Sequence, residues 1–280
     1  MAPLVLVAGA LHYDVLVRAD RLPGLDETLR GRSVSYVCGG KGGNQAVAAA
    51  RVAPTAMLGR VGDDHAGQVL LANLDAAGAD RTGVAVAAGE ASGMSVAIVN
   101  ESGDYGAVIV SAANLGLDVA DAAIPESVRV VLLQNEIPEA ANLTLAERAR
   151  AAGARVFLNA APARPFETAL RSLVDVLIVN RVEAAGLWGR AVATPADALA
   201  AAQALATEGP VIVTLGAEGA VLADAGEPRL FPAPPVEVVS SHGAGDAFAG
   251  TLAAHIALGA EIEEAVREAQ IEAARHVARA

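Results

Sequence analysis

The sequence predicts an α/β protein whose mostly parallel central sheet is covered by helices on both faces. Apolar segments of strand length alternate with Ala-rich helical segments along most of the 280 residues. Repeated βα units of this kind form parallel sheets. The chain is 54% hydrophobic but only 3% aromatic, so Val, Leu, Ile and Ala provide the packing, as in strands that are buried on both faces.

The expected elements follow one another in order along the chain. A buried strand is predicted at 4–9, and a Gly-rich loop then leads to a helix that begins at Asn44 and runs to residue 51. A strand at 56–62 precedes a helix that Asp63 or Asp64 caps and that runs to about Ala77. Further strands are expected at 128–135, 155–159, 175–180 and 210–216, with helices such as 138–152 and 195–207 between them.

Two segments interrupt this alternation within what we expect to be a single domain over residues 1–280. Residues 14–38 and 92–112 have strand patterns separated by turns and no helical pattern, and the turn NESGD (100–104) is typical of a hairpin. We expect both segments to join in a small β-sheet that serves as a lid or an interface. Pairing of its exposed edge strands across a two-fold axis predicts a homodimer.

Charge and cysteine content limit the partners and the compartment. A net charge of −12 and a pI of about 4.8 disfavour a nucleic acid as partner. The single cysteine, Cys38, excludes an internal disulfide and fits a reducing compartment. No uncharged apolar stretch has the length of a membrane span, and the N-terminus lacks the basic region of a signal peptide. We therefore expect a cytoplasmic protein without a membrane partner.

A first glycine-rich motif, CGGKGGNQAVAAAR, occupies residues 38–51. Glycines on both sides of Lys41 allow a ligand to approach the main chain, and Asn44 either caps a helix or hydrogen-bonds a hydroxyl group. The alternative is a tight turn into a packed helix. The spacing differs from the phosphate loop GxxxxGK[ST] and from the dinucleotide motif GxGxxG.

A second motif, SSHGAGDAFAG, occupies residues 240–250 and precedes an apolar helical segment. Gly243, Ala244 and Gly245 at a helix start expose N–H groups that bind an anion such as a phosphoryl group. Asp246 beside them is a candidate base for a hydroxyl proton. The alternative is a favourable first-turn charge, which contributes about 0.3–1 kcal/mol to stability.

These two motifs, in this order, resemble the two signatures of the ribokinase-like (PfkB) carbohydrate kinases. Four shorter segments also resemble that family: LQNEIP (133–138), NAAPAR (159–164), NRVEA (180–184) and TLGAEGA (214–220). Asp14 follows the first strand, where the family has a substrate-binding Asp. The resemblance extends from residue 4 to about 275.

The resemblance implies a ribokinase-like fold and the transfer of the γ-phosphoryl group of ATP to a primary sugar hydroxyl with Mg²⁺. It implies that Asp246 is the base and that the amides of Gly243, Ala244 and Gly245 form the anion hole. The residues implied to bind the sugar are Asp14, Gly40, Lys41, Asn44 and Glu136. Those implied to bind the nucleotide are Asn180, Thr214, Gly216 and Gly219, with Glu183 holding Mg²⁺ through water.

Two of these roles have a structural alternative. Lys41 acts either as a phosphate clamp or only through its backbone. Asn180 and Glu183 either act near the phosphates and Mg²⁺ or have no role in binding. In the second case, Asn180 only ends a strand and Glu183 only faces solvent.

The sequence also departs from the family pattern. Ser240 and Ser241 stand where ribokinases have Asp-Thr, and the sequence ends before the segment that completes their monovalent-cation site, so potassium activation gains no support. Tyr13 and His12 precede Asp14 where ribokinases often have Asn-x-Asp, which affects the sugar pocket. Ribose is the leading substrate. The alternatives are another sugar, a nucleoside, a non-catalytic regulatory relative and a Rossmann dehydrogenase, although the last lacks GxGxxG after the first strand.

Overall fold

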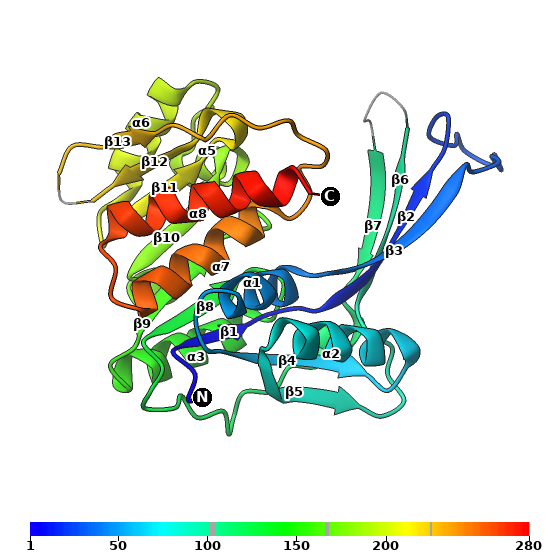
Figure 1. The fold of residues 1–280 in the computed structure, drawn as a ribbon, viewed down its shortest axis with the longest axis horizontal. Coiled ribbons are helices and arrows are strands. Elements are labelled where there is room, and N and C mark those ends of the chain that lie inside the picture. Colours follow the sequence, from blue (N-terminus) through cyan, green and yellow to red (C-terminus); the bar gives the residue numbers. More distant parts are fainter. Residues whose placement is uncertain (101–104, 166–167, 225, 280) are drawn as a thin grey trace.

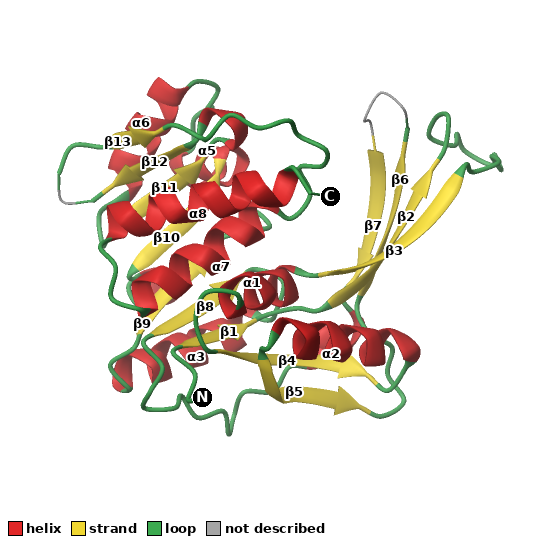
Figure 2. Cartoon of the chain, viewed as in Figure 1, coloured by secondary structure: helices red, strands yellow, loops and turns green. Residues whose placement is uncertain are grey.

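The computed structural model describes residues 1–100, 105–165, 168–224 and 226–279. Within these residues, the larger sheet has nine strands in the order β13-β12-β11-β10-β9-β8-β1-β4-β5 (Figures 1 and 2). All neighbouring strands from β11 to β5 are parallel, whereas β12 and β13 continue the sheet antiparallel. The strands are β1 (Val5–Ala8), β4 (Thr55–Gly62), β5 (Asp80–Ala87), β8 (Val130–Gln134), β9 (Arg155–Asn159), β10 (Val176–Asn180), β11 (Val211–Thr214), β12 (Ala220–Ala223) and β13 (Arg229–Phe231).

Helices cover both faces of this sheet and create two cores. One face carries α1 (Lys41–Ala50), α2 (His65–Ala77), α7 (Ala244–Ala257) and α8 (Ile262–Val277). The other carries α3 (Glu139–Ala151), α4 (Thr168–Arg171), α5 (Arg181–Trp188) and α6 (Pro195–Leu205). Strand β1 serves both cores, because Val5 and Val7 pack into the first and Leu6 and Ala8 into the second. The predicted fold class is therefore confirmed.

Helix α1 begins earlier than the sequence pattern predicts. The sequence pattern places its start at Asn44, but it begins at Lys41, directly after β3 (Ser33–Gly39), because Gly40 has a φ of 79° and turns the chain at the junction. A Cβ atom on Gly42 would lie 2.5 Å from the carbonyl carbon of Gly9. The first turn of α1 therefore packs against the backbone after β1, and its glycines permit this approach.

Other boundaries differ from expectation by a few residues. The strand at 155–159 and the end of α2 at Ala77 agree with the prediction, and Asp64 rather than Asp63 caps α2. Strand β5 and the short strands β12 and β13 were not predicted. Strand β5 has mostly exposed side chains, and β12 and β13 have only four and three residues, so their local patterns are weak.

A second, four-stranded sheet has the order β3-β2-β6-β7 and projects from the body of the molecule beside α1 and α2 (Figure 1). Its strands are β2 (His12–Arg18), β3 (Ser33–Gly39), β6 (Met94–Val99) and β7 (Tyr105–Val110). Both interrupting segments thus contribute to it as expected, and β6 and β7 pair antiparallel. The centre of the predicted turn between them, residues 101–104, lies outside the described residues.

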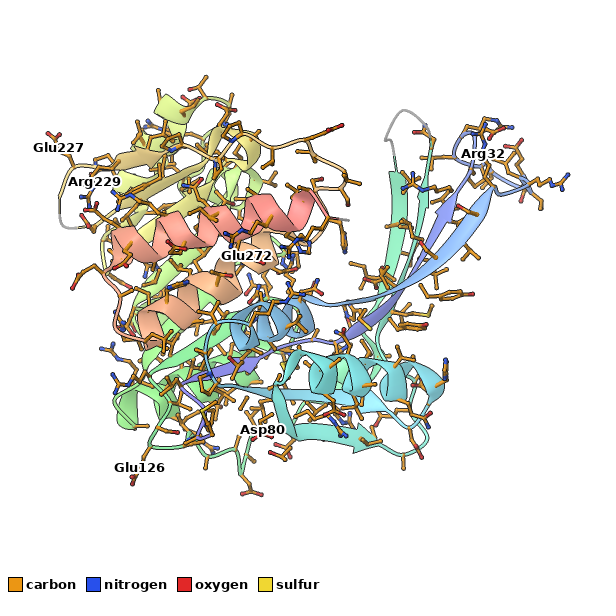
Figure 3. All side chains as sticks on the ribbon, in the orientation of Figure 1. Arg32, Asp80, Glu126, Glu227, Arg229 and Glu272 are labelled. Atoms are coloured by element: carbon orange, nitrogen blue, oxygen red, sulfur yellow. The ribbon has the colours of Figure 1, made fainter. Side chains whose placement is uncertain are left out.

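Many charged side chains of the described residues lie on the outside of the molecule. The labelled Asp80, Glu126 and Glu227 point away from the ribbon, and all three are exposed (Figure 3). In the described part of the chain, no helix is both long enough and apolar enough to cross a membrane.

Asp64 joins α2 to the segment before β6, and its replacement by Ala tests this link. Its carboxylate accepts hydrogen bonds from Gly67 N at 2.7 Å, Ser92 N at 2.8 Å and Ser92 Oγ at 2.6 Å. Asp64→Ala removes the helix cap and leaves the buried Ser92 with unpaired donors. We expect the free energy of unfolding to fall by about 2–4 kcal/mol in urea titrations.

The neighbouring exposed acid provides the matched control. Asp63→Ala should change the free energy of unfolding by less than about 0.5 kcal/mol. Equal losses for the two variants would contradict the role of Asp64.

Candidate active site

Asp246 lies in the first turn of α7, and two side chains of α1 hold its carboxylate. Asn44 Nδ2 donates to Asp246 Oδ2 at 3.1 Å, and Gln45 Nε2 donates to Oδ1 at 2.9 Å. Asp246 is only 7% exposed. The two glycine-rich motifs therefore meet around one buried carboxylate, and Asp246 is more than a solvated first-turn charge. Asn44 lies one turn inside α1 and contacts Asp246 instead of capping the helix.

The residues just before Asp246 leave its surroundings open. Gly243 has a φ of 74° and forms the N-terminal boundary of α7. A Cβ atom on Gly245 would meet no atom within 4 Å, so this residue faces open space. The first N–H groups of a helix lack carbonyl partners within it and attract anions. Ala244 N also donates to Ser241 O, at 3.3 Å.

Asp246 borders a pocket of about 180 Å³, which we call the polar pocket. Residues that the sequence places far apart line it together. They are Lys41, Asn159, Asn180, Glu183, Thr214 and Gly243–Asp246, with Ala161, Ile178, Val179 and Ser241. Asn159 was not predicted as a site residue, although it begins the NAAPAR segment at the end of a buried strand. Its Oδ1 atom is buried and has no hydrogen-bond partner.

Asn180 and Glu183 form a capping box at the start of α5. Asn180 N and Nδ2 donate to the Glu183 carboxylate at 2.7 and 2.9 Å, and Asn180 Oδ1 accepts from Val182 N and Glu183 N. Glu183 is 7% exposed, so the interpretation that it only faces solvent is wrong. Burial raises the pKa of Glu183, against the hydrogen bonds from Asn180. The capping box fixes this carboxylate at the wall of the polar pocket.

A second cavity, of about 320 Å³, adjoins the polar pocket, and we call it the apolar cleft. Thr214, Ser241, Ala244 and Gly245 line both. The rest of its wall consists of Gly216, Ala217, Gly219, Phe248, residues 233–236, Val238, and Gln270, Ala273, Ala274 and Val277 of α8. An apolar cleft that opens into a polar pocket has the form required by a ligand with a flat apolar part and a charged part.

Gly219 is constrained by the wall of this cleft. Its φ is 103°, and a Cβ atom there would lie 2.0 Å from Phe231 O. Glycine is therefore required where the loop after β11 passes β13. Gly216 also has a positive φ, of 61°, but faces open space.

Glu136 follows β8 and reaches the first turn of α1. Its Oε2 atom accepts a hydrogen bond from Lys41 N at 2.7 Å. Burial raises the pKa of Glu136 to about 7, and the negative charges of Asp246 and Asp14 act in the same direction, against the Lys41 contacts. Both aspartates are thus close enough to Glu136 for their charges to act on it.

Asp14 reaches this cluster from the small sheet. Its Oδ1 atom accepts a hydrogen bond from Ser95 N at 2.9 Å. A Cβ atom on Gly39 would lie 2.0 Å from Asp14 Oδ2, so glycine at that position leaves room for the carboxylate. Gly40 follows at the turn into α1, where a Cβ atom would lie 2.6 Å from Ala10 O. The site therefore lies at the junction of the two sheets.

Comparison with known proteins identifies the family. The model of the pfkB family carbohydrate kinases matches residues 2–279. The chain is 36% identical over 268 residues to the ribokinase of Bacillus subtilis, covering 94% of this chain and 89% of that protein. It is 31% identical to the deoxyribokinase of Salmonella typhimurium, covering 96% of this chain and 91% of that protein.

Solved structures agree with this assignment. The structure of Arabidopsis thaliana ribokinase complexed with ribose and ATP superposes with a TM-score of 0.89 at 29% identity, covering 99% of this chain and 93% of that one. The chain therefore belongs to the pfkB family of carbohydrate kinases and is an ATP-dependent sugar kinase.

Proposed function

We propose that this kinase phosphorylates the primary hydroxyl group of ribose, with Asp246 as the base and Mg²⁺ as the metal. The observation that carries the proposal is the buried Asp246 carboxylate, which two amides of α1 hold beside the amide-rich start of α7. Several similar proteins are named ribokinase, and one solved relative is complexed with ribose and ATP. A single cysteine and ATP as donor fit the cytoplasm as its location.

The proposed reaction is an in-line phosphoryl transfer. The sugar hydroxyl oxygen forms a bond to the γ-phosphorus while the bond from that phosphorus to the β–γ bridging oxygen breaks, and ADP leaves. The hydroxyl proton moves to the carboxylate of Asp246. Phosphoryl transfer depends mainly on positioning and on charge stabilisation. The amides of Gly243, Ala244 and Gly245 supply donors where negative charge accumulates.

The two adjoining cavities suit the two parts of ATP. We assign the adenine to the apolar cleft, between residues 233–238 and α8, and the phosphates to the polar pocket. Thr214, Gly216 and Gly219 then lie along the nucleotide, and Asn180 near its phosphates. Lys41 lines the polar pocket, so its ammonium group is available to the phosphates while its backbone N–H holds Glu136.

The polar pocket also suits a hydrated Mg²⁺ ion. Among the described residues there is no cluster of three or more His, Cys, Asp or Glu side chains able to hold a metal. Mg²⁺ needs few protein ligands, because it keeps several waters and binds phosphate oxygens. The unpartnered Asn159 Oδ1 and the Glu183 carboxylate supply oxygen atoms at this wall, with Glu183 acting through water. When bound, Mg²⁺ neutralises charge on the phosphates.

We assign the sugar to the junction of the two sheets. Asp14, Asn44 and Glu136 offer carboxylate and amide groups for several hydroxyls, and Gly40 and Lys41 offer backbone. The face of the small sheet that carries Asp14 then acts as a lid over the sugar. Deoxyribose is the main alternative, because a deoxyribokinase is similarly related to this chain; other sugars and nucleosides follow.

Asp246→Asn tests the base. The amide occupies the same space but does not accept the hydroxyl proton, so we expect kcat to fall by about 10²–10⁴-fold. Binding of ATP, measured by calorimetry, should remain. Asp63→Asn on the exposed surface is the matched control and should keep full activity.

The substrate is tested in the same assay. ADP release should be measured with ribose, deoxyribose, other sugars and nucleosides, with ATP and Mg²⁺. Highest kcat/KM with ribose supports the proposal, and preference for another compound contradicts the substrate but keeps the reaction. Turnover by Asp246→Asn near that of the native chain would exclude Asp246 as the base.

The raised pKa of Glu136 leads us to predict that sugar binding depends on pH. Its pKa of about 7 means that the carboxylate ionises as the pH rises through neutrality. The ionised form accepts hydrogen bonds from sugar hydroxyls more strongly than the protonated form. We therefore expect the KM for the sugar to fall about fivefold between about pH 6 and about pH 8. Glu136→Gln should have a raised KM without this dependence, and a parallel slope in that variant would contradict the assignment.

The small sheet has an apolar outer face that supports a homodimer. Val15 is paired with Tyr36 and Val96, and Val96 with Val108, so these side chains share the face opposite to that of Asp14. Tyr36 and Val108 are 57% and 68% exposed. Exposed apolar surface of this extent is typical of an interface. We infer that two copies pair through these outer faces.

Val108→Asp tests the dimer. A carboxylate in the middle of the apolar face should shift the molecule to a monomer in size-exclusion chromatography with light scattering. Leu230→Asp, which alters an exposed apolar residue of β13, should leave the dimer intact. A native chain that is monomeric at micromolar concentration would contradict the proposal.

A further inference from the structure

A buried chain of side-chain amides leads from β8 to Asp246. Gln134 Nε2 donates to Gln45 Oε1 at 2.7 Å, and Gln45 Nε2 donates to Asp246 Oδ1 at 2.9 Å. Both glutamines are fully buried. The backbone carbonyl of Gln134 accepts a hydrogen bond from Asn142 Nδ2 of α3 at 2.8 Å, which ties this end of the chain to the second core. Neither glutamine was predicted as a site residue.

The carboxylate of Asp246 and the backbone carbonyl of Leu132 set the directions of the hydrogen bonds in this chain. Gln134 Nε2 also donates to Leu132 O at 3.3 Å, which favours the same orientation of its amide. An ionised carboxylate only accepts, so Gln45 presents its NH₂ group to Asp246 and its Oε1 atom to Gln134. Gln134 must then present its own NH₂ group, which leaves Gln134 Oε1 without a partner, as the structure shows. A buried acceptor without a partner destabilises a fold, because it loses its hydrogen bond to water and gains none in return. The arrangement therefore has a cost that packing alone does not explain.

The backbone nearby leaves room for this glutamine. A Cβ atom on Gly9 would lie 1.8 Å from Gln134 Oε1, so any other residue at position 9 would displace the amide. A Cβ atom on Gly9 would also lie 2.8 Å from Gly42 Cα in the first turn of α1, the helix that carries Gln45. The contact between Gly9 and α1 that positions this helix therefore also leaves room for the chain of side-chain amides.

We propose that Gln134 is a positioning residue for phosphoryl transfer and acts through Gln45 on Asp246. This inference rests on the proposed function, in which Asp246 is the base. Gln134 holds the Gln45 amide in its donating orientation, and Gln45 holds Oδ1 on the buried side. Oδ2, which the part-buried Asn44 contacts, is then the oxygen that receives the hydroxyl proton.

Gln134→Glu tests the direction of the chain without changing its shape. When the introduced carboxyl group is ionised it only accepts, so Gln45 would turn to donate to it and would present Oε1 to Asp246 Oδ1. When that group is protonated, it has a hydroxyl donor and restores the native order. The kcat of this variant should therefore decrease as the pH rises and the introduced group ionises, whereas a residue with only a structural role would not produce this profile.

Charged groups around position 134 make a matched reference necessary. Asp246 is connected to Gln134 through Gln45, Glu136 lies two residues after Gln134 in the loop that follows β8, and Lys41 lies in the first turn of α1. Glu136 titrates near neutrality and affects the KM for the sugar. The quantity to measure is therefore the ratio of the variant's kcat to the native kcat at saturating sugar and ATP, at each pH from about 6 to about 9.

Two further variants complete the series. Gln134→Met keeps the length of the side chain but donates at no pH, so its kcat should be about tenfold lower throughout with an unchanged KM. Gln68→Glu, on the exposed side of α2, should match the native chain at every pH. For Gln134→Glu, we expect the kcat ratio to fall by about tenfold or more over this range.

The outcomes separate this inference from the proposed function. A flat kcat ratio for Gln134→Glu together with a native kcat for Gln134→Met, with Asp246→Asn inactive, would overturn the role of Gln134 and keep Asp246 as the base. A flat ratio with a lower kcat for Gln134→Met supports the inference, because a buried introduced carboxyl group that stays protonated keeps the native order. Turnover by Asp246→Asn would overturn the proposed function itself. Where Gln134→Glu does not fold, as judged by circular dichroism, Gln134→Met decides: a native kcat overturns the inference, and a lower kcat with native KM supports it.

Discussion

The close packing of α1 on α7 is the constraint on which the site depends. A Cβ atom on Gly250 would lie 2.4 Å from Gln45 O, so the two helix backbones meet without an intervening side chain. This contact brings Asn44 and Gln45 within hydrogen-bond distance of Asp246, although about 200 residues separate them. A wider separation of the helices would leave the carboxylate buried without partners, which is unfavourable.

Several carboxylates of the site lie close together in a buried environment, which disfavours their ionised forms. Asp14, Glu136 and Asp246 lie close enough for the charges of the two aspartates to raise the pKa of Glu136, and burial raises it further. Backbone and side-chain donors from α1 compensate in part, because Lys41 N holds Glu136 and the two amides hold Asp246. Perturbed acids of this kind gather at functional sites, where binding and proton transfer require them.

The two faces of the small sheet differ in what they contact. The side of β2 that carries Asp14 is directed to the junction with the large sheet, whereas the opposite face of the small sheet is apolar and exposes Tyr36 of β3 and Val108 of β7. Strand alternation makes this possible, because successive side chains point to opposite faces. In the proposed function, one face of the small sheet therefore binds the sugar, and the opposite face of the same sheet binds the second copy of the protein.

The sequence by itself determined the layered α/β fold, the small sheet and the two glycine-rich motifs, because hydrophobic periodicity and turn residues are local signals. It also placed Asp64 as a candidate helix cap. Only the tertiary structure decided that α1 begins at Lys41 and that Glu183 is buried in a capping box. It alone also decided that Gln134 and Gln45 form a hydrogen-bonded chain to Asp246 and that Asn159 lines the polar pocket. Polar residues in buried strands and helices have no periodic signal of their own. Their partners lie far away along the chain and become neighbours only when the helices and strands pack.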